Sequence, residues 1–297
     1  MKLPNLLVIG AHKAGSSSLY HFLAQHPDIY MSQIKELRFF NKDLPCWQNH
    51  NLMSTPEVRK YSQFFEEAKE GQLCGEATTA YLSCPNAPQR INKLIPQVKL
   101  LATLRHPVDR AYAHFNHEVR LGRESGLDFY LAMKNSSEAG PFNYRARGMY
   151  FSCLKRYYNL FDKDQVLPIL FEDLTTHVQE KQVAILEKIF SFLSISSFDI
   201  KFPHSNPGWI PKFPLLGQIL FGNLLYRKAF VFIHGRTMFN PELEPYVQWP
   251  LRLSHYLPKQ TIPPLDLDMR GELTEYFRDD ILHLQDLIQT DLSSWLN

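Results

Sequence analysis

Short apolar runs alternate with amphipathic segments along this chain. The runs at 6–9, 98–104 and 165–171 predict buried strands. Helices are predicted over 16–23, 56–69, 88–95, 127–133 and 179–193, with apolar residues at three- and four-residue spacing in 56–69. A further helix is predicted to begin near Pro107, and another opens at 147–150 and continues through Phe161. Pro168 conflicts with a central position for the third strand, because proline removes a hydrogen bond from the ladder. Alternating strands and helices predict the α/β class.

The last predicted helix has the clearest apolar face. Leu273, Phe277, Ile281, Leu284 and Ile288 follow one another at intervals of four, four, three and four residues. These positions lie on one side of a helix, so we expect this segment to pack against the rest of the protein.

One domain over residues 1–297 is the expected organisation, because the chain contains neither an internal repeat nor a low-complexity linker. Residues 205–262 are rich in proline and aromatic residues and are expected to form a variable insertion. Within them, Leu215–Tyr226 is interpreted as a helix that packs on the main sheet. A lid over a pocket and a contact with a lipid-like molecule are the alternatives.

The first strand leads into a loop of small residues and then a helix. The sequence LLVIGAHKAGSSSLYHFL places Gly10 and Gly15 at the ends of the loop and Ser16 at the start of the helix. The first backbone N–H groups of a helix lack intrahelical acceptors, and the helix dipole adds partial positive charge there. Lys13 adds a full charge, and three serine hydroxyls follow. The arrangement predicts a phosphate-binding loop.

This loop differs from the Walker A pattern, which has a lysine and a Ser or Thr directly after the second glycine. Here Ser16 follows Gly15, and Lys13 precedes that glycine by two residues. An ordinary turn between strand and helix with a solvated lysine is the alternative interpretation.

Arg105 follows the predicted strand at 98–104 and precedes Pro107, which suits the first turn of a helix. Ligand-binding groups of α/β sheets gather at the carboxyl ends of the strands. A guanidinium group at this place is suited to pairing with a phosphate. A strand–helix junction with a surface pair between Asp109 and Arg110 is the alternative.

The composition limits which ligands and which cellular location are expected for this protein. The formal net charge is +2, which argues against a general binder of nucleic acids or membrane surfaces. The four cysteines show no metal-ligand spacing, so we expect reduced thiols and no metal site. No signal peptide is evident at the first residues, and the apolar segment 213–233 is broken by polar residues, glycine and proline. A cytoplasmic protein without an integral membrane segment is therefore expected.

Several segments together resemble the sulfotransferases that use 3'-phosphoadenosine 5'-phosphosulfate (PAPS), in particular the heparan-sulfate-type and bacterial members. They are the loop around Lys13, the run KELRFF at 35–40, the run GEATTAYL at 75–82, the run LRHPVDRAYAHF at 104–115 and the run FEDL at 171–174. The resemblance implies a three-layer, P-loop-like α/β fold with a central parallel sheet flanked by helices.

The resemblance also implies roles for individual residues. Glu36 corresponds to the catalytic base, Lys13 to the group that stabilises the leaving phosphate, and Arg105 to the partner of the 3'-phosphate. The 5'-phosphate is assigned to Lys13, Ala14, Gly15, Ser16, Ser17 and Ser18. Arg147 and Gly148 resemble a segment that lies against the nucleotide.

Two positions depart from the family pattern. Ala113 stands where a serine usually makes the second contact with the 3'-phosphate, and His114 or His117 is a candidate substitute. Ala77 stands where heparan-type members often carry a lysine, which argues against a polysaccharide acceptor.

The predicted reaction is in-line transfer of a sulfuryl group from PAPS to a hydroxyl or amine, with adenosine 3',5'-bisphosphate as the product. The acceptor is left open among carbohydrates, lipids and small metabolites, as is the oligomeric state. One alternative is a nucleotide kinase, which predicts dependence on Mg²⁺ and a Walker-type lysine. Another is a non-catalytic nucleotide-binding protein with the same fold.

Overall fold

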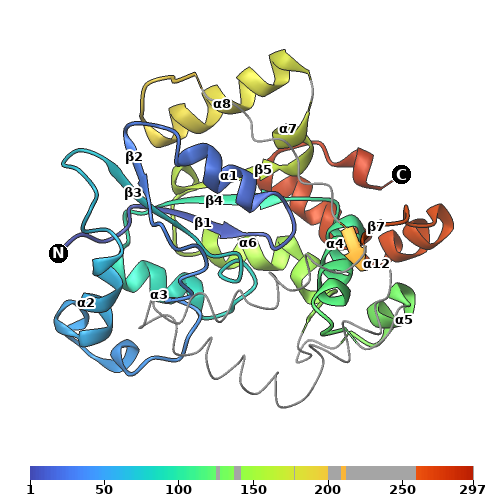
Figure 1. Ribbon diagram of the computed structural model, residues 1–297, viewed down its shortest axis with the longest axis horizontal. Helices are drawn as coiled ribbons and strands as arrows, with labels where there is room; N and C mark the ends of the chain where they lie inside the picture. The colour runs from blue at the N-terminus through green and yellow to red at the C-terminus, as the bar shows by residue number, and fades with distance from the viewer. Residues whose placement is uncertain (125–127, 137–141, 177, 200–208, 212–258, 297) are drawn as a thin grey trace. The chain divides into compact units, whose positions relative to one another are not determined.

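The computed structural model describes residues 1–124, 128–136, 142–176, 178–199, 209–211 and 259–296 (Figure 1). The chain divides into two compact units. Unit 1 comprises Met1–His106, Met149–Ser205 and Arg278–Trp295, and unit 2 comprises Pro107–Gly148, Asn206–Phe277 and Leu296–Asn297. The single domain expected from the sequence stays a prediction. The predicted helix at Leu215–Tyr226, with most of the insertion, lies outside the described residues.

Unit 1 is built on a five-stranded parallel sheet with the order β2-β3-β1-β4-β5. The strands are β1 (Leu6–Gly10), β2 (Ile29–Met31), β3 (Leu73–Ala77), β4 (Lys99–Leu104) and β5 (Val166–Leu170). The central strand β1 is buried along its whole length and pairs in parallel with both β3 and β4. Parallel strands covered on both faces appear as continuous apolar runs, which is why β1 and β4 were visible in the sequence.

Helices cover both faces of this sheet, so the predicted three-layer α/β architecture is confirmed. In Figure 1, α1 and α8 lie on one face and α3 and α6 on the other. The helices of unit 1 are α1 (Ser16–Leu23), α2 (Pro56–Gln63), α3 (Ala87–Leu94), α6 (Tyr150–Tyr158), α7 (Phe171–Thr175) and α8 (Gln179–Leu193).

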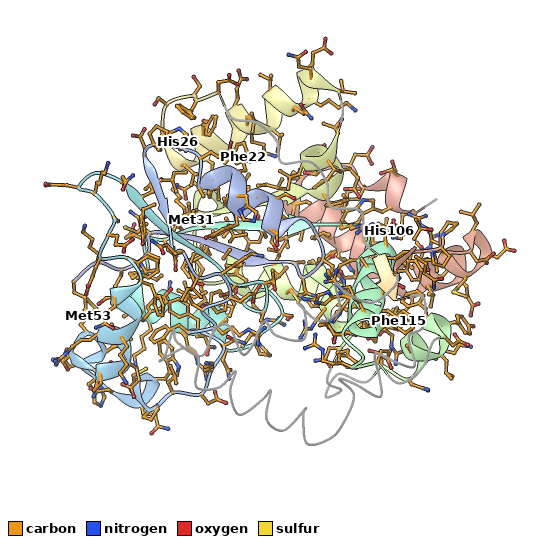
Figure 2. All side chains as sticks on the ribbon, in the orientation of Figure 1. Phe22, His26, Met31, Met53, His106 and Phe115 are labelled. Atoms are coloured by element: carbon orange, nitrogen blue, oxygen red, sulfur yellow. The ribbon has the colours of Figure 1, made fainter. Side chains whose placement is uncertain are left out.

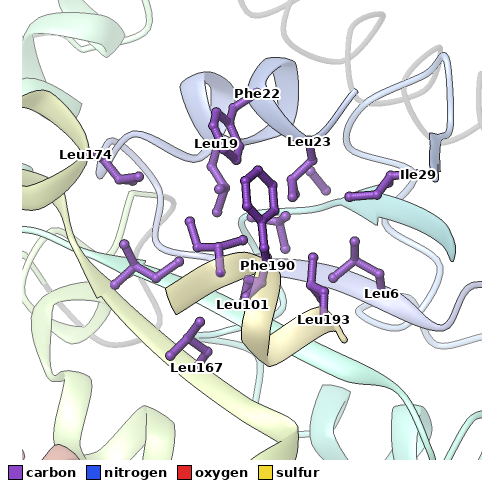
Figure 3. Close-up of a cluster of buried hydrophobic side chains, with 14 of the residues drawn as sticks. Leu6, Leu19, Phe22, Leu23, Ile29, Leu101, Leu167, Leu174, Phe190 and Leu193 are labelled. Atoms are coloured by element: carbon purple, nitrogen blue, oxygen red, sulfur yellow. The ribbon is translucent and has the colours of Figure 1, made fainter. Parts of the chain in front are cut away.

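The core under α1 and α8 buries the apolar side chains of these two helices against the sheet. Leu19, Phe22 and Leu23 of α1 meet Phe190 of α8 over the sheet (Figure 3), and the rings of Phe22 and Phe190 stack with centroids 6.0 Å apart. Alternate residues of the strands complete this cluster, among them Leu6, Val8, Leu101, Leu167 and Ile169. Burial of this apolar surface fixes α1, and with it the loop that precedes α1.

The proline in the third predicted strand is accommodated at the edge of the sheet. Pro168 lies in β5, opposite Ala102 of β4, and β5 is the last strand of the sheet. An edge strand needs ladder hydrogen bonds on only one side, so proline is tolerated there.

The helix predicted over 56–69 is too long, since α2 ends at Gln63. Beyond it the backbone forms tighter turns, with the N–H groups of Phe64, Phe65 and Glu66 bonded to the carbonyl groups three residues before them. Apolar spacing alone does not distinguish such turns from a continuing helix.

Unit 2 contains α4 (Pro107–Arg120), α5 (Phe129–Lys134) and an antiparallel pair of strands, β6 (Trp209–Pro211) and β7 (Lys259–Thr261). Phe115 of α4, labelled in Figure 2, contacts Phe129 of α5. Asp109 pairs with Arg270 at 3.1 Å. Arg110 is fully buried and donates to the carbonyl oxygen of Tyr144.

The final helix, α12 (Leu267–Ile288), begins in unit 2 and ends in unit 1. In unit 1, the Asp280 carboxylate accepts a hydrogen bond of 3.0 Å from the N–H of Phe151 in the first turn of α6. The buried side chains Ile281 and Leu284 confirm that this part of the predicted apolar face packs inward.

Candidate functional site

The predicted phosphate-binding loop lies between the carboxyl end of β1 and the first turn of α1. Gly15 immediately precedes α1 with φ of 89°, and the first bond of the helix runs from the N–H of Leu19 to the Gly15 carbonyl oxygen. The N–H groups of Ser16, Ser17 and Ser18 therefore have no intrahelical acceptor. The first turn contains no acidic residue, so nothing in it opposes the binding of an anion.

The side chains of this loop differ in their exposure. Lys13 is half-buried and has a φ of 65°, in the left-handed region that side-chain-bearing residues seldom adopt. Ser16 is buried, Ser18 is half-buried, and exposed Ser17 accepts a hydrogen bond of 2.8 Å from Lys35 Nζ. Two lysines thus reach the loop, one from within it and one from the segment that carries Glu36.

The positive φ at position 15 and the close approach of Phe171 both require glycine there. A Cβ atom at this position would lie 3.0 Å from Cδ2 of Phe171, tighter than an ordinary contact. Gly71 has a similar φ of 84°, but a Cβ there would have no neighbour within 4 Å among the described residues.

We expect Gly15→Ala to lower the free energy of unfolding by more than Gly71→Ala does. Both changes carry the backbone cost of the left-handed region, about 1–2 kcal/mol. Only Gly15→Ala also forces Phe171 to move, which adds roughly 1–3 kcal/mol. Urea unfolding of the two variants measures the difference, and equal losses would contradict the close packing against Phe171.

Arg105 follows β4, at the same carboxyl edge of the sheet as the loop after β1. Its guanidinium group lies over the ring of Phe171, 4.6 Å from the centroid. The Arg105 carbonyl oxygen accepts a hydrogen bond of 3.0 Å from the Tyr150 hydroxyl. Within the described residues the guanidinium donates no hydrogen bond, so its donors remain available to a ligand. Phe171 contacts both Gly15 and Arg105, so one side chain joins two segments ninety residues apart.

Glu36 lies in a loop beyond the carboxyl end of β2, with a φ of 64°. One oxygen of its carboxylate, Oε1, accepts hydrogen bonds from the Thr79 N–H at 3.1 Å and the Thr79 hydroxyl at 2.8 Å. The other, Oε2, is buried and has no hydrogen-bond partner among the described residues. Arg38 Nε lies 3.7 Å from Oε2. Within the described part of the chain, the carboxylate is therefore anchored by hydrogen bonds through one oxygen, while the other is held only by the ion pair with Arg38.

Two further lysines lie near these charged groups, Lys35 beside Glu36 and Lys42 beside Arg38. Burial lowers the pKa of Lys35, although the neighbouring Glu36 acts in the opposite direction. Burial and the charge of Arg38 lower the pKa of Lys42 to about 8. Cations that are costly to desolvate are common at sites that receive an anion.

Arg147 and Gly148 belong to unit 2, whereas the groups described above belong to unit 1. Gly148 ends a short 3₁₀ turn, Ala146–Gly148, and a Cβ there would meet the ring of Phe277 at 2.9 Å. Ala113 also belongs to unit 2. The assignment of Arg147 and Gly148 to the nucleotide, and of His114 or His117 as substitutes for a serine, stays a prediction.

Residues 3–201 match the family model described as the sulfotransferase domain, which is more than half of the chain. The chain belongs to the sulfotransferase family. It is 26% identical over 313 residues to human bifunctional heparan sulfate N-deacetylase/N-sulfotransferase 3, and 26% identical over 316 residues to the mouse protein numbered 1 of the same name. Both alignments cover 99% of this chain but only 31% of the relative, so the chain spans about a third of the length of these relatives.

A solved structure agrees with this assignment over the whole chain. The crystal structure of a sulfotransferase from Alicyclobacillus acidocaldarius covers 100% of both chains, with 28% identity and a TM-score of 0.68. The chain therefore carries a sulfotransferase domain.

The structure of the sulfotransferase also draws attention to residues that the sequence did not single out. Lys35 and Arg38 were visible in the KELRFF run, but their contacts with Ser17 and Glu36 depend on the folded loop. Thr79 and Phe171 likewise acquire their roles only through contacts distant in sequence. In the described part of the chain, no group of three or more potential metal-ligating side chains was found. No helix in that part is long and apolar enough to cross a membrane.

The most deeply buried carboxylate of this unit is Glu76, at the carboxyl end of β3. Its Oε1 accepts hydrogen bonds from the hydroxyls of Tyr61 and Tyr81, both at 2.7 Å, and its Oε2 accepts one of 2.8 Å from Thr78. Burial raises the pKa of Glu76 to about 7, although these hydrogen bonds act to lower it. The charge of Glu36 adds to the rise.

We expect this carboxyl group to make stability depend on pH. The folded protein binds the Glu76 proton more tightly than the unfolded chain, so its stabilising contribution is present below about pH 4 and is lost as pH rises through about 7. Glu76→Gln cannot ionise and should therefore lose less stability over that interval. Between pH 5 and pH 8, the Tm of the variant should therefore rise by several degrees relative to the Tm of the parent. A constant difference would contradict the raised pKa.

Proposed function

We propose that this sulfotransferase moves a sulfuryl group from PAPS to a hydroxyl or amine, with Glu36 as the base and Lys13 beside the leaving phosphate. The proposal rests chiefly on Phe171, which packs against Gly15 in the loop and supports the Arg105 guanidinium. Two anion-binding elements therefore flank one side chain. A nucleotide with phosphates at both its 5' and 3' positions has the charges to engage both elements.

The residues present fit an anionic donor. The first turn of α1 offers N–H groups and the Ser17 and Ser18 hydroxyls, and Lys13 adds a positive charge. Arg105 has donors that no described residue uses. When bound, the donor supplies an activated sulfuryl group. In this proposal, Lys13 neutralises the charge that develops on the departing phosphate, and such electrostatic stabilisation is usually the largest contribution to catalysis.

Glu36 has the features of a general base. Two hydrogen bonds from Thr79 to Oε1 fix the orientation of the carboxylate, so the position of the buried Oε2 is fixed as well. A proton leaving an acceptor hydroxyl or amine needs such a site during transfer. The positive charges of Lys35 and Arg38 act on this carboxylate and would offset the negative charge that the donor brings.

Calorimetric titration tests the choice of donor. We expect adenosine 3',5'-bisphosphate to bind and ATP with Mg²⁺ to bind much more weakly. The reverse order would overturn the proposal in favour of a nucleotide kinase. Binding without transfer to any acceptor would favour a non-catalytic nucleotide-binding protein.

The names of the relatives suggest one class of acceptor to test. These relatives are named as heparan sulfate N-sulfotransferases, which makes an amine of heparan sulfate one candidate acceptor. Ala77, at the position of a lysine in heparan-type members, favours a smaller acceptor instead. Labelled PAPS should be offered with de-N-sulfated heparin, lipid headgroup alcohols and small phenols in parallel, and the labelled product identifies the class.

Arg105→Ala should weaken binding of adenosine 3',5'-bisphosphate by about 10- to 100-fold, because hydrogen bonds to a charged group are lost. Adenosine 5'-phosphosulfate, which lacks the 3'-phosphate, should lose less than about threefold. Arg59→Ala on α2 is the control, since Arg59 is exposed and bonds to the Ser54 carbonyl oxygen. Equal losses for both ligands would place Arg105 away from the 3'-phosphate.

A further inference from the structure

The loop that carries Glu36 adopts a conformation that its own sequence disfavours. Glu36 and Arg38 have φ values of 64° and 58°, both in the left-handed region. Residues with side chains occupy this region at a cost, and they remain there only where surrounding contacts compensate. The contacts that hold this loop are therefore part of what presents the Glu36 carboxylate.

Hydrogen bonds from the loop converge on the last residue of β3 and the segment that follows it. The N–H of Glu36 donates to the Ala77 carbonyl oxygen at 2.8 Å. The N–H of Arg38 donates to the Thr78 hydroxyl oxygen at 3.2 Å, and that of Phe39 donates to the Tyr81 hydroxyl oxygen at 2.9 Å. Two of these three acceptors are hydroxyl groups, whose orientation is not fixed by the backbone.

Glu76 determines how these two hydroxyls are oriented. A hydroxyl has one proton, and it accepts from an N–H only when that proton points elsewhere. In its ionised form, Glu76 receives the proton of Tyr81 at Oε1 and the proton of Thr78 at Oε2. Both hydroxyls then turn a lone pair toward the loop. Glu76 is completely buried, so water does not compete for these protons.

We propose that Glu76 is a positioning residue that holds the Glu36–Phe40 loop in its left-handed conformation through the hydroxyls of Tyr81 and Thr78. This inference rests on the proposed role of Glu36 as the base. Glu76 itself does not contact the reacting groups. It acts through two hydroxyls and the backbone of the loop.

Tyr61 provides a matched control. Its hydroxyl donates to the same oxygen of Glu76 at the same distance as Tyr81, 2.7 Å. Its ring stacks on Phe39, with centroids 4.2 Å apart. Among the described residues, however, its hydroxyl accepts nothing from the loop. Tyr61→Phe and Tyr81→Phe therefore each remove one bond to Glu76 from a fully buried ring, and only Tyr81→Phe removes an acceptor of the loop.

Hydrogen exchange followed by mass spectrometry tests the inference directly. In Tyr81→Phe, the amides of the peptide covering residues 36–40 should exchange about tenfold faster than in Tyr61→Phe, while peptides of β1 and β4 remain alike in the two variants. Thr78→Val should accelerate exchange in the same peptide, and Thr78→Ser, which keeps the hydroxyl, should restore it. Equal exchange at 36–40 in the two tyrosine variants would overturn the inference.

Kinetics on the same samples separate this inference from the proposed function. With labelled PAPS and de-N-sulfated heparin, Tyr81→Phe should lower kcat about tenfold with little change in the KM for PAPS, and it should have no further effect in a Glu36→Gln background. An unchanged rate for Glu36→Gln would contradict Glu36 as the base. A large effect of Glu36→Gln with equal exchange in the tyrosine variants would contradict only the role of Glu76. If the protein does not sulfate de-N-sulfated heparin, hydrogen exchange at residues 36–40 in the two tyrosine variants still tests the inference.

Discussion

Lys13→Ala should lower kcat for sulfuryl transfer by about 100- to 1000-fold, while the protein stays folded. Removing one preorganised group that stabilises developing charge typically has an effect of this size. Lys13 has a positive φ in the loop before α1, and Ala meets the same backbone restriction as Lys. The substitution therefore removes the charge without introducing a new conformational cost. Initial rates with labelled PAPS measure the loss, and circular dichroism reports the folded state.

Lys188→Ala is the appropriate control for this experiment. Lys188 is exposed on α8, within the same unit, and its removal changes the net charge by the same amount. We expect its rate to stay within about twofold of the parent. If Lys13→Ala also stays within that range, Lys13 is not beside the leaving phosphate.

Glu36→Gln should lower kcat by about 100- to 10,000-fold, the usual contribution of a general base. The amide oxygen of glutamine still accepts the two hydrogen bonds from Thr79, so the orientation of the side chain is retained. What changes is the oxygen beside Arg38, Oε2, which becomes an NH₂ group and no longer accepts a proton. Binding of adenosine 3',5'-bisphosphate should be almost unaffected, because Glu36 is not assigned to the donor phosphates.

Glu187→Gln on α8 controls for the loss of one negative charge from this unit, since Glu187 is exposed. A rate for Glu36→Gln close to that of Glu187→Gln would mean that another group, or water, accepts the proton. Exchange at residues 36–40 would then show whether the loop or the carboxylate had been altered.

Periodicity in the sequence was sufficient for the strands and helices that bury continuous apolar surface. Helix α8 was predicted at its observed bounds, and β1 and β4 were found within one residue at each end. The short strands β2 and β3 were not predicted, because β2 has three residues and β3 contains Gly75 and Glu76. A buried charged residue within a strand obscures the apolar pattern, and only its partners in space make its burial favourable.

The sequence by itself determined the fold class and the family, and it predicted two segments that would bind anions, because glycine, lysine and arginine at strand ends are suited to phosphate groups. Only the tertiary structure decided that Phe171 joins Gly15 to Arg105, that Thr79 anchors Glu36, and that Glu76 is enclosed by three hydroxyl groups. These contacts join residues far apart along the chain or depend on which way a loop turns. Parallel strands bring such residues together at one edge of the sheet, and no local pattern records which side chains meet there.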